Sequence, residues 1–239
     1  MPVTDQGTRG GTTLMLVRHA DVHNPGDVLY GRLPRFGLSE LGRHQAERTA
    51  SVLAGEPISA FYSSPMLRAR QTMRILAARH PEAAIHITRL LDEVRSGWQG
   101  RSHAELEEIG FNFYDKPLDP MDEKLGDVWE RLQRFVRLAR RRHPGESVVG
   151  VTHGDPVIIA RAAYLRLPLE VASIRHPNIY PGKGSITRLT FGPELEDMYP
   201  LRLEYCDPNG EDSRWSQGWV TMEPSSGVLD GSGLRDPYQ

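Results

Sequence analysis

The 239-residue sequence has a single cysteine, Cys206, and a formal net charge of only −2. One cysteine excludes an intramolecular disulfide framework and suits a reducing compartment. The small net charge gives no general attraction for nucleic acid or an anionic membrane, so anion binding requires a local basic cluster. No segment approaches the ~20 apolar residues of a membrane span, and the N-terminus lacks the apolar stretch of a secretory signal. We therefore expect a soluble cytoplasmic protein without nucleic-acid or membrane partners.

The chain is long enough for one hydrophobic core, since 38% of its residues are hydrophobic. We predict a flexible N-terminal tail at 1–13 and one domain at 14–206. Within this domain, a polar and aromatic insertion at about 95–126 is expected to cover the substrate. The extension at 207–239 is rich in Asp, Gly, Ser, Pro and Asn, which favours partial disorder.

Apolar runs alternate with helical spacing along the domain. Two apolar runs, at 14–18 and 148–152, stop abruptly at polar residues, as expected of strands buried on both faces in a parallel sheet. Further strands are predicted at 60–63, 85–88, 185–191 and 201–205, and helices at 39–53, 64–79, 102–109, 127–144 and 156–165. This order predicts an α/β fold, a three-layer sandwich with a mostly parallel central sheet.

Local signals refine two of these helices. Ser64 is expected as the N-cap and Pro65 as the first residue of the second helix, which places Arg68 in its first turn. Free backbone N–H groups at that end favour anions. In the first helix, which Ser39 is expected to cap, the spacing predicts Leu41 on the buried face.

Both apolar runs end at a histidine, His19 after Arg18 and His153 in the sequence VTHGD. Open α/β sheets bind ligands at the carboxyl ends of their strands, so the two histidines are expected to converge. A neutral imidazole can attack a phosphoryl group, and we predict His19 as this nucleophile. Arg18 and Arg68 supply the cationic donors that a phosphate requires. His153, if protonated, adds a third donor, and Asn24 a neutral one.

The leaving alkoxide needs a proton, which a carboxylic acid with a raised pKa delivers. Glu93, in the segment LLDEVRSGWQG, is the best candidate. Asp92 is the rival.

Other residues are candidates for binding the rest of the substrate. They are Tyr30, Gly31, Arg32 and Gly154, the insertion residues Phe111, Phe113, Tyr114 and Lys116, and His176 and Lys183 from the loop HPNIYPGKG. For the aromatic insertion, ordinary packing is an equally good explanation. The run Arg140 to Arg142 closes a helix, where cations suit the dipole, so it does not indicate nucleic-acid binding.

At these motifs the chain resembles the histidine phosphatase superfamily, which includes the cofactor-dependent phosphoglycerate mutases. The matching segments are RHA at 18–20, GRLPRFGLSELGRHQA at 31–46, SSPMLRARQT at 63–72, the Glu93 segment and VTHGD, in the family's order over about residues 14 to 165. The resemblance implies a phosphohistidine on His19, phosphate binding by Arg18, Arg68 and His153, and proton donation by Glu93. It also implies no metal or organic cofactor.

Three positions depart from the family pattern. Ala20 replaces the usual glycine, Asp21 stands where glutamate is common, and Asn24 lies one residue closer to the histidine than in the mutases. With the absence of a NERHYG-like stretch around Glu93, the Asn24 spacing argues for a hydrolase. We therefore predict a phosphomonoesterase acting on a small phosphorylated metabolite, possible as a homodimer. A phosphoglycerate mutase and a non-catalytic phosphate-binding module are the alternatives.

Overall fold

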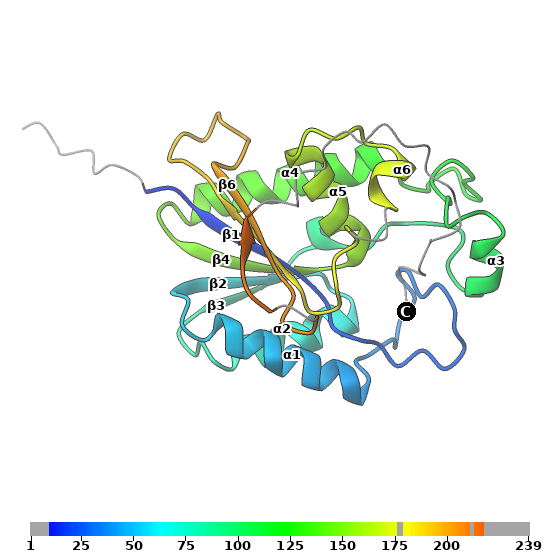
Figure 1. Ribbon diagram of the computed structural model, residues 1–239, viewed down its shortest axis with the longest axis horizontal. Helices are drawn as coiled ribbons and strands as arrows, with labels where there is room; N and C mark the ends of the chain where they lie inside the picture. The colour runs from blue at the N-terminus through cyan, green and yellow to red at the C-terminus, as the bar shows by residue number, and fades with distance from the viewer. Residues whose placement is uncertain (1–9, 176–178, 211–212, 218–239) are drawn as a thin grey trace, which may run out of the picture.

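The computed structural model describes residues 10–175, 179–210 and 213–217. A seven-stranded sheet with the order β3-β2-β4-β1-β5-β6-β7 lies at its centre (Figure 1). The strands are β1 (Thr13–Arg18), β2 (Ile58–Ser63), β3 (Ala84–Ile87), β4 (Ser147–Thr152), β5 (Ile186–Thr190), β6 (Arg202–Cys206) and β7 (Ser216–Gln217). The first four strands pair in parallel, whereas β5, β6 and β7 each pair antiparallel with the preceding strand in this order. The prediction of a mostly parallel sheet is confirmed.

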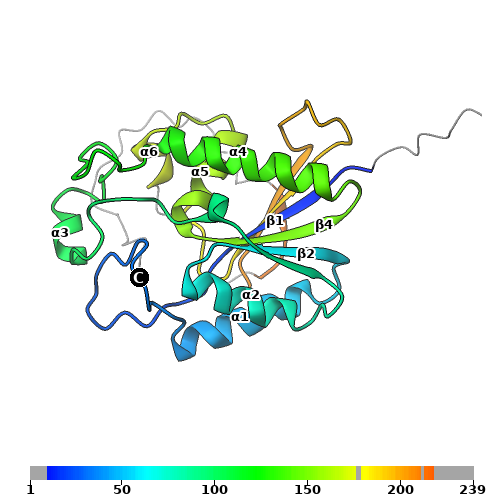
Figure 2. The ribbon, with the colours of Figure 1, turned by 180° about the vertical axis from the view of Figure 1, so that it is seen from behind.

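Helices cover both faces of this sheet. They are α1 (Glu40–Leu53), α2 (Leu67–Ala77), α3 (His103–Glu107), α4 (Leu125–Arg142), α5 (Gly154–Tyr164) and α6 (Val171–Ile174), with a 3-10 turn, η1 (Arg89–Leu91). The views from both sides show α1 and α2 on one face, with α4 and α5 on the other (Figures 1 and 2). The three predicted layers are therefore present.

Alternation along β1 explains how one strand serves both layers. Leu14 and Leu16 belong to the core cluster that contains α4 and α5 side chains, while Met15 and Val17 belong to the cluster with α1 and α2 side chains. Successive strand residues point to opposite faces, so a continuous apolar run fills both cores. Full burial of such a side chain contributes about 1.5–3 kcal/mol to folding.

Several predicted helix ends and faces were wrong. The second helix begins at Leu67, with Met66 rather than Ser64 at its N-cap. Leu41 keeps 54% of its surface exposed, because it lies in the first turn of α1 beyond the edge of the core. Helix α4 starts at Leu125 rather than after Asp127. The Asp127 carboxylate accepts from the Lys124 backbone N–H instead of capping the helix itself.

The start of α5 also differs from the prediction, because the helix begins at Gly154 directly after His153 rather than at Pro156. The N-terminal tail and the extension fall largely outside the described residues, and so does His176. No helix in the described part of the chain is long and apolar enough to cross a bilayer.

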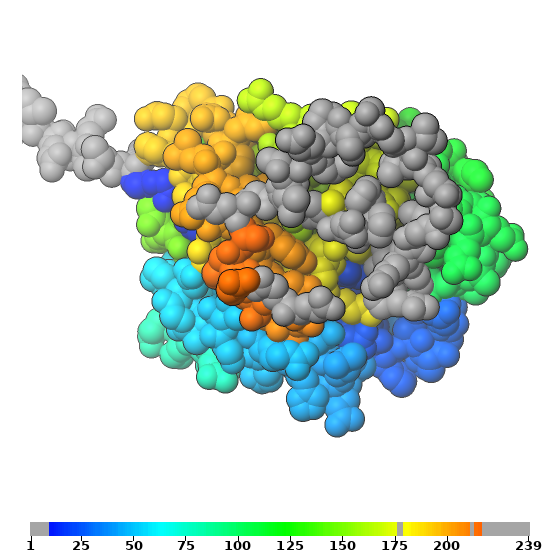
Figure 3. Space-filling model, viewed as in Figure 1, coloured from blue at the N-terminus to red at the C-terminus, as the bar shows by residue number. Residues whose placement is uncertain are grey.

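The insertion at 95–126, called the lid here, lies beside the loop that follows β1. Leu29 N–H donates to the Arg101 carbonyl and Gly100 N–H to the Leu29 carbonyl, both at 2.8 Å. Both ribbon views place α3 next to this loop, and the space-filling view shows the green lid and the blue loop as one surface (Figures 1, 2 and 3). The lid thus borders the end of the sheet where β1 delivers His19.

Candidate active site

Neighbouring strands bring the two histidines together. Because β1 and β4 pair in parallel, with Arg18 opposite Thr152, His19 and His153 leave the sheet at the same edge. Their ring centroids are 5.1 Å apart, and both side chains are buried. On the other side of β4, β2 leads into α2, which carries Arg68 in its first turn. The predicted convergence is therefore a property of the sheet order.

The Arg68 guanidinium links these groups. Its Nε donates to His19 Nε2 at 3.0 Å, and its Nη2 donates to His153 Nδ1 at 2.9 Å and to the Gly31 carbonyl at 2.8 Å. The Arg68 side chain is completely buried, and among the described residues its Nη1 has no hydrogen-bond partner. A buried guanidinium nitrogen without a partner costs free energy unless an anion accepts from it. This nitrogen is therefore suited to a phosphate oxygen.

His19 is fixed in one tautomer. Its Nδ1 donates to the Ala20 carbonyl at 2.8 Å, which leaves Nε2 with the lone pair that faces Arg68. Burial, followed by the charges of Arg68 and Arg18, holds the pKa of His19 well below its usual range. The ring is therefore neutral at pH 7, as a nucleophile must be.

His153 is held from its other side by a residue that the sequence analysis assigned differently. Since its Nδ1 accepts from Arg68, the neutral ring carries its proton on Nε2, which donates to Ser64 Oγ at 2.9 Å. Burial, and then the charge of Arg68, lowers the pKa of His153 well below the usual value. Ser64 thus orients a site histidine instead of capping α2, and the dipeptide Ser64-Pro65 gave no signal for this.

Glu93 faces both Arg68 and His153. Its Oε2 lies 3.9 Å from Arg68 Nη2 and 3.6 Å from His153 Nδ1. Burial and then the charge of Asp155 raise the pKa of Glu93 to about 7. A carboxyl group with this pKa is poised for proton transfer at neutral pH.

Asp92 lies one contact further from His153 than Glu93 does, because Ser64 stands between them. Its carboxylate contacts Arg89 Nε at 3.4 Å and accepts a long hydrogen bond of 3.5 Å from Ser64 Oγ. Burial raises the pKa of Asp92 as well. Geometry favours Glu93 over Asp92, because the Glu93 carboxylate contacts both Arg68 and His153, whereas the Asp92 carboxylate contacts Arg89 and Ser64.

Arg18 and Tyr30 lie beside the group formed by His19, Arg68, Glu93 and His153, which is called the phosphate pocket here. The buried Arg18 donates through Nη1 to the Pro181 carbonyl at 2.6 Å, beside the Tyr180 ring. The Tyr30 ring lies edge-on to His19 at 6.2 Å and under the Arg68 guanidinium at 4.6 Å. Both residues belong to the pocket, and Tyr30 stabilises the Arg68 charge through its ring face.

The remaining predicted binding residues have different positions. The Asn24 carboxamide is used within its own loop, where it donates to the Val28 carbonyl at 2.9 Å and accepts from the Val28 N–H. Arg32 lies at the pocket edge, where its Nε donates to the Glu93 carbonyl at 2.7 Å and its Nη2 contacts Glu123 at 2.8 Å. Lys183 also lies nearby, but its Nζ is paired with Asp21 at 2.6 Å.

The aromatic residues of the lid mainly fill the core. Phe111, Phe113 and Tyr114 are buried in the cluster under α4 and α5, so packing explains them better than substrate contact. The Tyr114 hydroxyl donates to Asp155 at 2.5 Å, an interaction that sequence reasoning missed. Lys116 is exposed.

Three possible metal ligands also meet at the centre of the pocket. One ligand atom from each of His19, Glu93 and His153 lies within 4.8 Å of the others. However, the Arg68 guanidinium, which carries a permanent positive charge, already donates a hydrogen bond to one nitrogen of each imidazole. A second cation there would meet like-charge repulsion, whereas an anion would be attracted.

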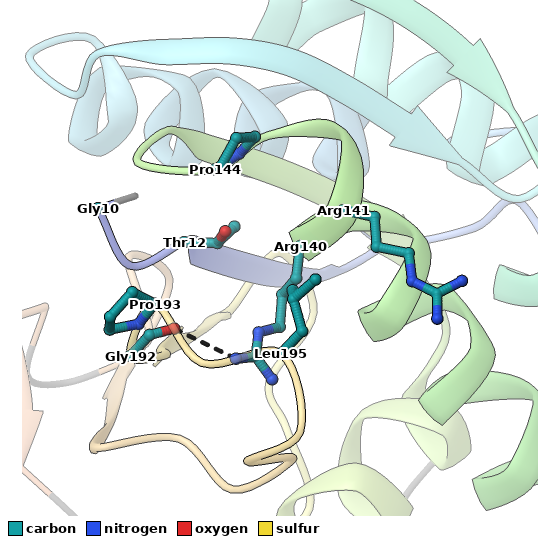
Figure 4. Close-up of a pocket in the computed structure, with 8 residues that line it drawn as sticks. All are labelled: Gly10, Thr12, Arg140, Arg141, Pro144, Gly192, Pro193 and Leu195. Atoms are coloured by element: carbon teal, nitrogen blue, oxygen red, sulfur yellow. Dashed lines mark hydrogen bonds between the residues drawn. The ribbon is translucent and has the colours of Figure 1, made fainter. Parts of the chain in front are cut away.

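A second pocket lies at the opposite end of the sheet, where α4 meets the β5–β6 loop (Figure 4). Its lining residues are Gly10, Thr12, Arg140, Arg141, Pro144, Gly192, Pro193 and Leu195. The buried Arg140 donates to the backbone carbonyls of Gly192, Glu194 and Asp197. Arg140 therefore fastens a loop, which agrees with the interpretation of its basic run as structural.

Comparison with known proteins gives consistent matches. The family model of the histidine phosphatase superfamily (branch 1) matches residues 14–198. Phosphoserine phosphatase 1 of Hydrogenobacter thermophilus is 32% identical over 162 residues, covering 64% of this chain and 75% of that protein. A 2,3-bisphosphoglycerate-dependent phosphoglycerate mutase of Thermoplasma acidophilum is 30% identical over 155 residues, covering 64% and 76%.

A solved structure of a mycobacterial glucosyl-3-phosphoglycerate phosphatase has a TM-score of 0.63 and 25% identity, and the match covers 87% of this chain and 97% of that one.

Proposed function

Because the chain belongs to the histidine phosphatase superfamily, we propose that it is a phosphomonoesterase that hydrolyses a small phosphorylated metabolite through a phosphohistidine on His19. One observation carries the proposal. A buried arginine donates to the Nε2 atom of a neutral histidine and keeps another nitrogen, Nη1, without a partner among the described residues. Nucleophile and anion donor are thus already side by side.

The first half-reaction transfers the phosphoryl group to the enzyme. His19 Nε2 attacks phosphorus, a new N–P bond forms, and the P–O bond to the leaving alcohol breaks. The Arg68 N–H groups turn from His19 Nε2 toward the phosphoryl oxygens. Arg18 supplies a second positive charge to the phosphoryl group. Preorganised cations of this kind stabilise the charge of the transition state without rearrangement of solvent.

Glu93 supplies the proton that the leaving oxygen needs. Its pKa of about 7 keeps a large fraction of the group protonated at neutral pH. In the second half-reaction the Glu93 carboxylate takes a proton from water, whose oxygen attacks the phosphohistidine. The N–P bond breaks, phosphate leaves, and Glu93 and His19 return to their starting states.

His153 completes the phosphate pocket opposite His19. In the structure its Nδ1 accepts from Arg68, so it donates to a phosphoryl oxygen only after gaining a proton. A substrate bound as the monoanion can supply this proton from its own P–OH group. The imidazolium then adds a third cationic donor, and its Nε2–H remains on Ser64.

The metal-free reaction is also a proposal, supported by the guanidinium that lies against both imidazoles. A cytoplasmic location and a homodimer stay predictions. The mutase alternative keeps one specific support, the identity to the Thermoplasma enzyme. Isomer interconversion faster than phosphate release, with dependence on 2,3-bisphosphoglycerate, would favour it. Phosphate binding without turnover of any phosphoester would favour the non-catalytic module.

The test is a rapid quench with a ³²P-labelled phosphomonoester such as glycerol 3-phosphate. We expect acid-labile, alkali-stable label on His19, and loss of both label and phosphate release in His19→Ala. His23→Ala is the matched control, because His23 is an exposed histidine in the same loop. Phosphate release that survives in His19→Ala would contradict the proposal, and loss of release in the presence of EDTA would contradict the metal-free reaction.

A further inference from the structure

Asp155 gathers more hydrogen bonds than a helix-terminal acid needs. It is the second residue of α5, two positions after His153, and only 2% of its surface is exposed. Its carboxylate accepts from Arg175 Nη1 at 2.7 Å, Arg175 Nη2 at 3.0 Å, the Tyr114 hydroxyl at 2.5 Å and the Tyr180 hydroxyl at 2.7 Å. These four donors saturate the lone pairs of an ionised carboxylate.

The donors come from separate parts of the chain. Tyr114 belongs to the lid, Arg175 follows α6, and Tyr180 precedes Pro181, whose carbonyl accepts from Arg18. The Arg175 guanidinium also lies over the Phe113 ring of the lid at 5.1 Å. One buried carboxylate therefore connects the lid and the Arg18 side of the pocket to the helix that follows His153.

Gly154 shows how closely these parts approach. A Cβ atom at this position would lie 2.3 Å from the Tyr180 hydroxyl oxygen, so any side chain here would require the Tyr180 ring to move. Gly154 was predicted to bind substrate. Its lack of a side chain instead lets the Tyr180 hydroxyl reach the Asp155 carboxylate.

We propose that Asp155 is a positioning residue for the reaction, whose buried carboxylate holds Tyr114 of the lid, and Tyr180 beside Arg18, in the arrangement that encloses the phosphate pocket. The inference rests on the proposed phosphatase function and deepens it. These contacts keep the Asp155 carboxylate ionised. Burial alone would raise its pKa, but Arg175 and then the tyrosine hydroxyls bring the pKa below the ordinary value.

The charge of Asp155 also acts on the proton donor. Around Glu93, burial and then Asp155 raise its pKa, whereas Arg68 and Arg131 lower it. His153 lies 3.6 Å from the carboxylate, and Arg32 donates to the Glu93 backbone carbonyl. Removal of the Asp155 charge leaves Arg175 as an extra positive charge, so both changes lower the pKa of Glu93.

The experiment compares Asp155→Asn with Tyr114→Phe, using kcat/KM for glycerol 3-phosphate across pH. An alkyl phosphate is required, because its strongly basic leaving group needs the Glu93 proton. Asp155→Asn is expected to move the alkaline limb of the profile to lower pH. Tyr114→Phe keeps the charge and loses one lid contact, so we expect a KM increase of about 3- to 10-fold with the limb unmoved.

Tyr62→Phe is the matched control. Tyr62 is also buried, its hydroxyl contacts His143, and its ring lies against His86 and Phe135, none of which belongs to the lid or the candidate site. It is expected to keep the wild-type KM and limb, even if its stability falls. This separates loss of a buried hydroxyl as such from loss of the contact with Asp155.

The proposal is overturned if two results are obtained together. The alkaline limb of the pH profile of Asp155→Asn must coincide with that of the wild type, and the KM of Tyr114→Phe must equal that of Tyr62→Phe. Should Asp155→Asn fail to fold, Tyr114→Phe and Tyr180→Phe decide, and equality of both with the control overturns it. A wild-type protein that releases no phosphate contradicts the proposed function, whereas an active wild type with unaffected variants contradicts only the role of Asp155.

Discussion

Two buried arginines, Arg68 and Arg140, show how the same side chain serves chemistry in one region and structure in another. Arg140, at the end of α4, donates to three backbone carbonyls of the β5–β6 loop. Arg68, at the start of α2, donates to a nitrogen of each site histidine, and its Nη1 is left without a partner in the described part of the chain. Carbonyls cannot react or ionise at neutral pH, whereas imidazoles can. The partners, rather than burial, distinguish the two regions.

The largest expected difference comes from replacing each arginine by methionine. Arg68→Met is expected to lower kcat/KM by about 10³-fold, because a cationic donor to the transferring phosphoryl group is lost. Its melting temperature should also fall, since the Gly31 carbonyl and one nitrogen of each imidazole lose their buried donor. Initial rates of phosphate release and thermal melts check both parts. Arg74→Met, an exposed change in the same helix, is the control, and equal activity of the two variants would refute the role of Arg68.

The second-largest expected difference between the two regions concerns Glu93, the proposed proton donor. Glu93→Gln is expected to lower kcat/KM for glycerol 3-phosphate by about 10²- to 10⁴-fold. It should affect p-nitrophenyl phosphate much less, because the nitrophenolate leaves without a proton. In the wild type, kcat/KM for the alkyl ester should fall above about pH 7, where Glu93 loses its proton. Arg140→Met should leave this profile unchanged, and an equal effect of Glu93→Gln on both substrates would assign the proton transfer elsewhere.

Glu93 also links pH to stability. Its pKa is raised in the folded state, so between the unfolded value of 4.5 and the folded value of about 7 the native protein binds more protons than the unfolded chain. Stability relative to Glu93→Gln should therefore decline as pH rises through this window and stay constant above it. Chemical denaturation at pH 4.5 and pH 8 measures the difference, and a constant difference would contradict the raised pKa.

For Arg140 the expected effect is on stability. Arg140→Met removes the donors of three backbone carbonyls, and we expect the free energy of unfolding to fall by about 2–4 kcal/mol. The kcat/KM of the folded protein should stay within about 2-fold of the wild type. Denaturant unfolding checks the first value, and Arg141→Met, at an exposed neighbouring position, is the control. A stability equal to that of Arg141→Met would show that the loop does not depend on Arg140.

The smallest expected effect concerns Asn24. Its carboxamide is already used by Val28, so Asn24→Ala should change KM by no more than about 3-fold. A phosphate-binding amide would give a larger change in kcat/KM than this. Steady-state kinetics with glycerol 3-phosphate distinguish the two roles, and a change above about 10-fold would restore Asn24 to the phosphate pocket.

Much of this arrangement was predictable from sequence because it depends on local patterns. The apolar runs predicted β1 and β4, and the sheet order then brought His19 and His153 to one edge. The positions of Arg68 and Glu93 relative to them also matched the expectation. Ser64 was misassigned, because a serine before proline resembles an N-cap whether its hydroxyl contacts backbone or His153.

Contacts between distant segments escaped prediction altogether. Nothing in the sequence near Asp155 indicates that Tyr114, Arg175 and Tyr180 share its carboxylate. Likewise, the aromatic lid residues could not be divided between substrate wall and core until the packing was known.

The sequence alone thus determined the α/β layers and the residue types of the candidate site, since hydrophobic periodicity and residue chemistry are properties of short segments. Tertiary structure alone decided which nitrogen of each histidine faces Arg68, why Glu93 is protonated near neutral pH, and what Asp155 holds. These depend on burial and on charges from residues far apart in the chain, and both exist only once the segments have packed together.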